Sequence, residues 1–187
     1  MWLPVEANLE FDVRQAVLSD SAAIARVHVD SWRTAYRGII DEDYLAGLSY
    51  VDRETMWYRE IANPRNFVLV SEDIRIGMPA KVIGFVSGGA NRSKDTSYTG
   101  ELYAIYILEE YRGQGIGKKL VRSLVERLVD HDFNSMLVWV LVKNPYRQFY
   151  EKLGGQYVRS QEIQIGRTNF EEVAYGWKDL SDLLKMQ

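Results

Sequence analysis

Residues 100–128 carry GELYAIYILEEYRGQGIGKKLVRSLVERL, the stretch that decides the fold. Its first part predicts a strand with Glu101, Tyr103, Ile105 and Ile107 on one face and Leu102, Ala104, Tyr106 and Leu108 on the other. Because both faces are mostly apolar, this strand should lie inside a sheet and not at its edge. Residues 120–128 then repeat leucine and valine at three- and four-residue spacing, which predicts a helix.

Three glycines, Gly113, Gly115 and Gly117, lie between the end of this strand and the start of this helix. Glycine lets main-chain N–H groups turn towards one small space, and the first N–H groups of a helix have no partner within it. With the positive end of the helix dipole, these donors form an anion site that suits a phosphate or a pyrophosphate. The plain alternative is a turn that only lets the helix and the strand pack closely.

Two common phosphate-binding patterns do not match this loop. In the nucleotide pattern G-x-x-x-x-G-K-[ST], Arg112 would stand at the first glycine and Lys119 at the serine or threonine. In the dinucleotide pattern G-x-G-x-x-G, Lys118 would stand at the third glycine, and no acidic residue at a strand end follows at the right distance. Both nucleotide readings therefore fail.

The run Arg112-Gly113-Gln114-Gly115-Ile116-Gly117 resembles the R/Q-x-x-G-x-G/A motif of the GNAT superfamily of acyl-CoA N-acyltransferases. The resemblance implies that the main-chain amides of residues 112–117 hold the pyrophosphate of coenzyme A. Lys118 would be a neighbour of the phosphate and not a catalytic lysine. Acetyl-CoA is then the expected cosubstrate.

Composition limits the other possibilities. The 187 residues predict one N-acetyltransferase domain over 1–187, and 47% hydrophobic with 26% charged residues is ordinary for a soluble globular protein. A net charge of −3 does not favour nucleic-acid binding. There is no cysteine, and two histidines are too few for a histidine metal cluster, so we expect no metal. With no membrane-spanning run, the expected location is the cytoplasm.

The order of elements predicts an α/β (α+β) protein with a mixed central sheet and helices on both faces. The first expected helix is capped by Ser19 or Ser21 and runs through Tyr36. The other expected helices are a short one capped by Asp41 and ending near Gly47, one over 52–61 with Ser49 and Asp52 as a capping box, the central helix, and one from Asn144 to Leu153. The expected strands are 9–13, 67–71, 81–87, 101–108, 136–142, 157–165 and 170–177, with a long connection over 88–100. This order matches the GNAT fold from residue 9 to residue 177.

A second segment resembles the same family. Residues 144–154, NPYRQFYEKLG, are similar to its N…FYEKLG segment. The resemblance implies that Asn144 bonds the pantetheine arm and that Tyr150 lies beside the thioester sulfur. Tyr146 stands where the family commonly has a small residue, which would narrow the coenzyme channel.

Acetyl transfer to an amine needs a neutral amine, a stabilised oxyanion and a proton for the leaving thiolate. Tyr150 is the candidate proton donor, because a phenol with a pKa near ~10 can protonate a thiolate; otherwise it is a packing tyrosine. Glu101 is the candidate base or relay; otherwise it is a strand-end carboxylate in water. The main chain of Ile105, Tyr106 and Ile107 should pair with the pantetheine arm and polarise the thioester carbonyl.

The acceptor is expected to be a primary amine of a small cationic molecule, acetylated directly and without a covalent intermediate. Trp32 and Tyr36 either wall its pocket or belong to the core. The acidic turn at residues 41–43 would favour a cation near a pocket mouth, and a homodimer is possible. The competing function is a non-catalytic acyl-CoA-binding sensor or interaction module with a GNAT fold.

Overall fold

The computed structural model describes residues 10–75, 79–93 and 97–185. Its seven strands form one sheet in the order β1-β2-β3-β4-β5-β7-β6. Neighbouring strands run antiparallel except β4 and β5, which run parallel. The strands are β1 (Phe11–Gln15), β2 (Asn66–Asp73), β3 (Lys81–Ala90), β4 (Gly100–Ile107), β5 (Met136–Leu141), β6 (Gln156–Ile165) and β7 (Thr168–Trp177).

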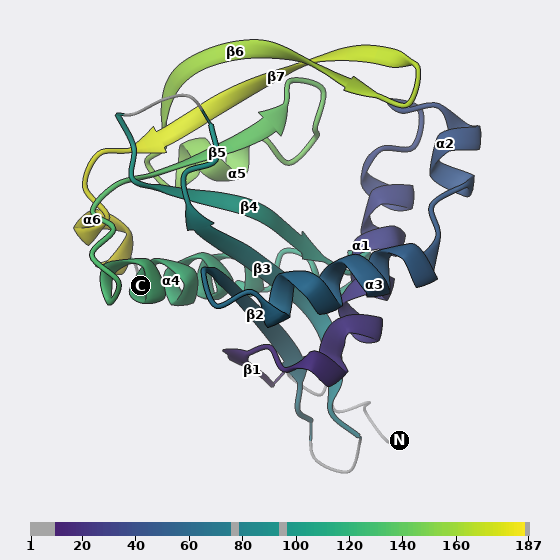
Figure 1. Cartoon of the computed structure of the whole chain (residues 1–187), viewed down its shortest axis with the longest axis horizontal. Helices are drawn as coiled ribbons and strands as arrows, with labels where there is room; N and C mark the ends of the chain where they lie inside the picture. The colour runs from purple at the N-terminus through teal and green to yellow at the C-terminus, as the bar shows by residue number, and fades with distance from the viewer. Residues whose placement is uncertain (1–9, 76–78, 94–96, 186–187) are drawn as a thin grey trace, which may run out of the picture.

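Helices cover both faces of the sheet, as Figure 1 shows. They are α1 (Ser21–Ala35), α2 (Glu42–Ala46), α3 (Tyr50–Ala62), α4 (Ile116–Val129), α5 (Gln148–Lys152) and α6 (Ser181–Leu184), with short 3₁₀ turns η1 (Leu18–Asp20) and η2 (Glu109–Tyr111). On β3, a side chain at Gly84 would meet Leu120 of α4, whereas Phe85 stacks edge-on against Trp57 of α3. The two faces therefore carry different helices, and the predicted α/β fold with a mixed sheet is confirmed.

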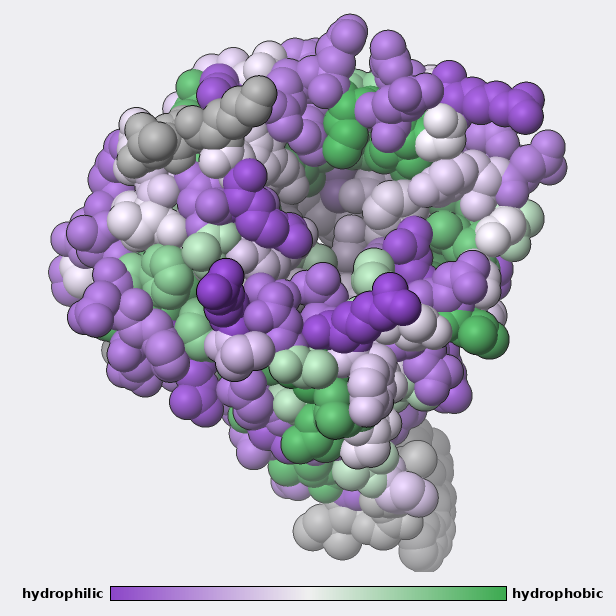
Figure 2. Space-filling model, viewed as in Figure 1, coloured by the Kyte–Doolittle hydropathy of each residue, from purple (hydrophilic) through white to green (hydrophobic). Residues whose placement is uncertain are grey.

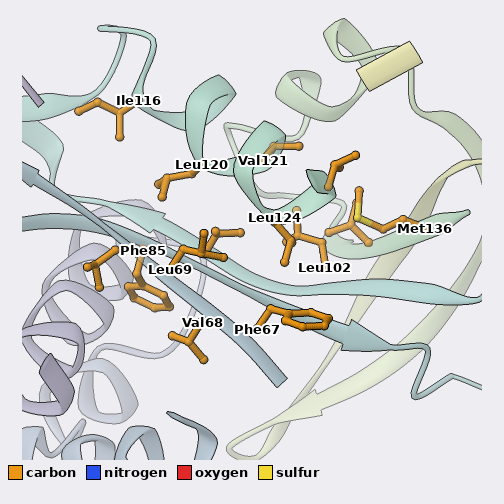
Figure 3. Packing of buried hydrophobic residues seen from close by; sticks show 14 of the residues in the cluster. Phe67, Val68, Leu69, Phe85, Leu102, Ile116, Leu120, Val121, Leu124 and Met136 are labelled. Carbon is orange, nitrogen blue, oxygen red and sulfur yellow. The ribbon is translucent and has the colours of Figure 1, made fainter. Parts of the chain in front are cut away.

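Helix α4 forms the centre of the larger core. Leu120, Leu124 and Leu128 recur at four-residue spacing and are fully buried. Figure 3 shows Leu120 and Leu124 pointing towards the strands, with Leu102 of β4 below them. Burial of each leucine contributes roughly 1.5–3 kcal/mol. This packing fixes the start of α4 close to the end of β4.

A bulge in β4 corrects the predicted alternation of side chains. Ser87 of β3 faces Ala104 and Gly88 faces Leu102, so Tyr103 is the extra residue. The bulge puts Glu101 and Tyr103 on the α1 face but Ile105 and Ile107 on the α4 face. An apolar pattern on both sides of a strand carries no sign of such a shift.

Some helix and strand boundaries differ from the prediction because local hydrogen bonds determine them. The caps at Asp41 and Ser49 are confirmed, since their side chains accept the N–H groups three residues on. The predicted cap at Ser19 or Ser21 is wrong, because the N-cap of α1 is Asp20 and it makes no side-chain cap hydrogen bond. The predicted helix from Asn144 begins only at Gln148, because residues 144–147 form tight turns, including Arg147 N–H to the Asn144 carbonyl at 3.2 Å. Residues 88–90 belong to β3 and not to a loop. Residue 9 lies outside the described residues.

Candidate active site

Strands β4 and β5 separate after a short paired region. They pair only through residues 100–102 and 136–138, after which β5 continues beside β7 alone. Residues 103–107 and residues 139–141 do not pair with each other, and we call the region between these two segments the β4–β5 wedge. Because no strand fills it, main-chain groups of β4 that point away from β3 face the wedge.

Two residues of β4 direct their main chain into the wedge. The N–H of Leu108 donates to the Ile83 carbonyl at 2.9 Å, on the β3 side. Since successive residues of a strand point their main-chain groups to opposite sides, Tyr106 also faces β3, and Ile105 and Ile107 face the wedge. Of the three residues predicted to pair with a pantetheine arm, the main chain of Tyr106 is therefore directed elsewhere.

The glycine loop ends directly at the first turn of α4. Gly113 and Gly115 have φ angles of 76° and 85°, in the region that favours glycine. Gly115 is the N-cap of α4, with no side-chain cap. The N–H groups of the first helical residues, Ile116, Gly117 and Lys118, therefore have no acceptor within the helix. A side chain at Gly117 would meet the Phe149 ring at 3.2 Å, so this glycine also lets α4 approach α5.

The Arg112 side chain turns away from the loop and towards the wedge. Its Nε donates to the Ile107 carbonyl at 3.0 Å, and its terminal nitrogens donate to the Tyr146 hydroxyl at 2.8 Å and the Thr34 hydroxyl at 3.0 Å. It therefore ties α1, the end of β4 and the turn before α5 together. The Gln114 amide donates to the Glu110 carbonyl at 3.2 Å.

Asn144 lies on the opposite side of the wedge from β4, in the turn after β5. Its Oδ1 accepts the N–H of Tyr146 at 2.8 Å, and its Nδ2 donates to the Tyr36 hydroxyl at 3.0 Å. The asparagine predicted for coenzyme binding is thus held in place by the end of α1.

Three tyrosines gather near the wedge. The ring of Tyr150 is partly buried between Phe149 and Tyr175, with centroid distances of 5.4 Å and 6.3 Å. Burial raises the pKa of the Tyr150 phenol, and the nearby Tyr36 adds to the effect. Burial also raises the pKa of the Tyr36 and Tyr106 phenols. A phenol with a raised pKa keeps its proton at neutral pH, so Tyr150 can act as a proton donor and not as a base.

Trp32 and Tyr36 lie together on the side of α1 that faces the sheet. Their rings are 5.0 Å apart, and Tyr36 belongs to a second core cluster that includes Leu141 of β5. Next to them, His28 is buried, stacks on Tyr106 at 5.1 Å and accepts a hydrogen bond from the Trp57 Nε1 at 3.0 Å. Trp32 and Tyr36 therefore contribute both to packing and to the wall beside the wedge.

Glu101 is buried at the start of β4, so it is not a strand-end carboxylate in water. Its Oε2 accepts the main-chain N–H of Arg92 at 2.7 Å, and its Oε1 lies 3.8 Å from the Arg92 guanidinium. Glu109 and Glu110 lie in η2 and are exposed.

Sequence reasoning did not single out Glu172 as a site residue. Strand pairing sets Glu172 of β7 opposite Leu141 and Gln161, and sets Ala174 between Trp139 and Arg159. These residues share the α1 face of the sheet, because Leu141 packs against α1. We call Glu101, Trp139, Arg159, Gln161 and Glu172 the polar floor. Figure 2 shows the surface hollowed between the β6–β7 hairpin and α3, over this part of the sheet.

The residues 27–155 match the model of the acetyltransferase (GNAT) family. The chain belongs to this family. The chain is also 43% identical over 171 residues to YuaI of Bacillus subtilis (strain 168), an uncharacterised N-acetyltransferase, covering 91% of this chain and 95% of that one. The predicted membership of the GNAT superfamily and the prediction of an acyltransferase enzyme are confirmed.

Solved structures of low sequence identity share the fold. The PaiA N-acetyltransferase of Thermoplasma acidophilum in complex with coenzyme A superposes with a TM-score of 0.68, at 19% identity, over 88% of this chain and 98% of that one. The structure of yncA from Salmonella typhimurium with its cofactor acetyl-CoA gives 0.67 at 23% identity, over 91% and 94%.

The described residues hold neither a metal cluster nor a membrane-spanning helix. Within residues 10–75, 79–93 and 97–185, no three histidine, aspartate or glutamate side chains are placed to share a metal ion. In the same part of the chain, every helix is too short or too polar to cross a lipid bilayer.

Proposed function

We propose that the protein transfers an acetyl group from acetyl-CoA directly to the primary amine of a small cationic molecule. The observation that carries this proposal is the wedge, whose wide end meets the start of α4. One continuous path then leads from an anion site, past main-chain groups of β4 that pair with no strand, to Tyr150 and the polar floor. We further propose that residues 1–187 act as one domain, and that any homodimer forms at the edge strand β6.

The residues of this path fit coenzyme A. The uncapped N-terminus of α4 and the left-handed glycines of the loop would hold a pyrophosphate. Ile105 and Ile107 would pair with the amides of a pantetheine arm as an added strand does. Asn144 and Arg112 line the same channel, and Tyr146 narrows it through its bond to Arg112.

The chemistry divides between main chain and side chains. Acetyl-CoA supplies an acetyl group on a thiol leaving group. An N–H of Ile105 or Ile107 would donate to the carbonyl oxygen as negative charge develops there. Tyr150, which keeps its proton at neutral pH, would protonate the sulfur. Glu101 would act as base or as a relay through water.

Carboxylates around the hollow support a cationic acceptor. Glu101 and Glu172 are both buried, and both lie on the α1 face of the sheet. The acidic turn at residues 41–43 lies at the start of α2, where Asp41 accepts the N–H of Tyr44 at 3.0 Å. The ring centroids of Tyr44 and Trp32 are 6.4 Å apart, so this turn lies near Trp32 on α1.

Release of the coenzyme thiol tests the proposal. The protein is mixed with acetyl-CoA and a panel that contains a polyamine, an aminoglycoside, an amino acid and a peptide with a free N-terminus. We expect release that depends on one cationic small amine, with a product heavier by one acetyl group. Slow release that is independent of every amine would contradict acetyl transfer. Ping-pong kinetics would contradict the direct route.

A further inference from the structure

The Glu172 carboxylate is buried on the polar floor. Only 8% of this residue is exposed, although β7 has one sheet face towards the hollow. Its strand neighbours on the same face are Leu141 of β5, which packs against α1, and Gln161 of β6. Glu172 therefore lies between the wall formed by α1 and the outer hairpin.

One oxygen of this carboxylate has a donor and the other has none in the described chain. The amide of Gln161 donates to Oε1 of Glu172 at 2.7 Å. For Oε2, the structure provides no hydrogen-bond donor among residues 10–75, 79–93 and 97–185. Oε2 is not among the described polar atoms that are both buried and unpaired, so the small exposed part of Glu172 includes this oxygen. Oε2 is therefore open to a ligand from the solvent side.

The groups around Glu172 do not neutralise its charge. Glu101 lies on the same face across Trp139, and Arg159 places its guanidinium over the Trp139 ring at 5.3 Å. Burial raises the pKa of the Glu172 carboxyl, and the negative charge of Glu101 adds to this, against the Gln161 hydrogen bond. Burial is also the main cause that raises the pKa of Tyr36, with a contribution from Glu172. Glu172 is thus close to the phenol that contacts Asn144.

Both carboxylate oxygens of Glu101 already face Arg92. Its Oε2 already accepts the Arg92 N–H at 2.7 Å, and its Oε1 faces the Arg92 guanidinium at 3.8 Å. The same guanidinium lies 3.3 Å above the Tyr103 ring, which holds it in position. Both oxygens of Glu101 therefore have partners, whereas Oε2 of Glu172 has none among the described residues.

We propose that Glu172 binds the ammonium group of the acceptor through Oε2 and removes its proton, with Glu101 as the second carboxylate of the binding site. This inference rests on the proposed function and moves the role of base from Glu101 to Glu172 of β7. It also defines the acceptor as a primary amine that enters as its ammonium form.

The proposed step balances. An N–H bond of the ammonium breaks and an O–H bond forms on Glu172, which leaves a neutral amine. The nitrogen lone pair then forms the C–N bond while the C–S bond breaks, and the electron pair leaves with sulfur. Tyr150 protonates the sulfur and recovers a proton from the acylated nitrogen. Glu172 releases its proton to water, so the products are the amide, the free thiol and one proton.

The first test measures binding without acetyl-CoA. n-Butylammonium chloride is titrated into wild-type protein, Glu172→Gln and the matched control Glu171→Gln, which alters the exposed neighbour on the opposite face. We expect Glu172→Gln to weaken binding at least tenfold and Glu171→Gln to leave it unchanged. In wild-type protein the ¹³C-carboxyl resonance of Glu172 should shift on binding, which tests the contact even if the variant does not fold. Equal binding by both variants, an unmoved resonance or no saturable binding would overturn the inference.

The second test measures turnover against pH with the best acceptor of the amine panel. Glu172→Gln should lower kcat/KM by about 10²-fold at pH 7. The loss should shrink as the pH approaches the pKa of the amine, because the amine is then neutral without help. An unchanged profile would remove Glu172 from the mechanism while acetyl transfer by the wild-type protein stands. If wild-type protein acetylates no amine, the proposed function fails, and the butylammonium titration alone decides the role of Glu172.

Discussion

The amide of Asn144 donates a 3.0 Å hydrogen bond to the phenol oxygen of Tyr36. This bond joins the turn before α5 to the C-terminal end of α1, across residues that are far apart in the sequence. Tyr36 is buried and lies near Tyr150, so the bond sets the relative position of the turn, the helix and the candidate proton donor.

Removal of either partner should therefore destabilise the protein in a coupled way. Tyr36→Phe leaves the Asn144 amide without its acceptor and should cost about 1–3 kcal/mol of unfolding free energy. Asn144→Ala should cost a similar amount, and the double variant clearly less than the sum. Urea unfolding of the four proteins measures the coupling energy. Strictly additive losses would show that the two side chains do not support each other.

Replacement of Tyr150 by phenylalanine should affect turnover and not coenzyme binding. The ring packing against Phe149 and Tyr175 is kept, and only the proton of the hydroxyl is lost. We expect kcat to fall by about 10²-fold or more and the Kd for acetyl-CoA to change little. Tyr157→Phe, at an exposed position of β6, is the matched control. Equal turnover by Tyr150→Phe and wild-type protein would exclude the phenol as proton donor.

Substitution of two left-handed glycines distinguishes the effect of backbone strain on stability from the effect of the loop on coenzyme binding. Gly115, at φ 85°, and Gly38, at φ 72°, both have no atom within 4 Å of an added Cβ. Alanine at either position should destabilise the fold by about 1–2 kcal/mol through backbone strain alone. Gly115→Ala should also weaken acetyl-CoA binding at least tenfold, because the loop N–H groups are displaced. Calorimetry that finds the same affinity for both variants would place the pyrophosphate elsewhere.

Stability should fall with acidity because of His28. Burial, with a smaller contribution from Arg53, lowers the pKa of His28 to about 3 in the folded protein. An unfolded chain takes up this proton below about pH 6.5, so the contribution of His28 is complete above that pH. It is lost as the pH falls towards 3, by at most about 1.4 kcal/mol per pH unit. Unfolding measured from pH 7 to pH 4 checks this.

The control for this pH dependence uses the other histidine. His28→Gln keeps an acceptor for Trp57 and should flatten the loss of stability with acidity, whereas His131→Gln, at an exposed position, should not. If the free energy of unfolding falls equally steeply with decreasing pH in wild-type protein and His28→Gln, other groups cause the acid sensitivity.

Features with a local cause could be predicted from the sequence. The leucine spacing of α4, the caps at Asp41 and Ser49, and the glycine loop before α4 all depend on near neighbours in the chain, and all are found. The position of Asn144 and Tyr150 beside one channel followed from the resemblance to the GNAT family, and their exact roles stay predictions.

Features that depend on distant partners could not be predicted from the sequence. The bulge at Tyr103 arises from its register against β3, and the helix start at Gln148 from tight turns after Asn144. In a strand, Glu172, Ala174 and Gly176 share one face, but their sequence does not tell what that face meets. Only the pairing of Glu172 with Leu141, which packs against α1, shows which helix this face of the sheet meets.

A crystal structure of the protein with coenzyme A tests the central claim most directly. The account predicts pyrophosphate oxygens within hydrogen-bond distance of main-chain N–H groups of residues 113–118, and the pantetheine arm between β4 and β5 beside Ile105 and Ile107. Density for the coenzyme at any other surface, with the wedge left to water, would contradict it.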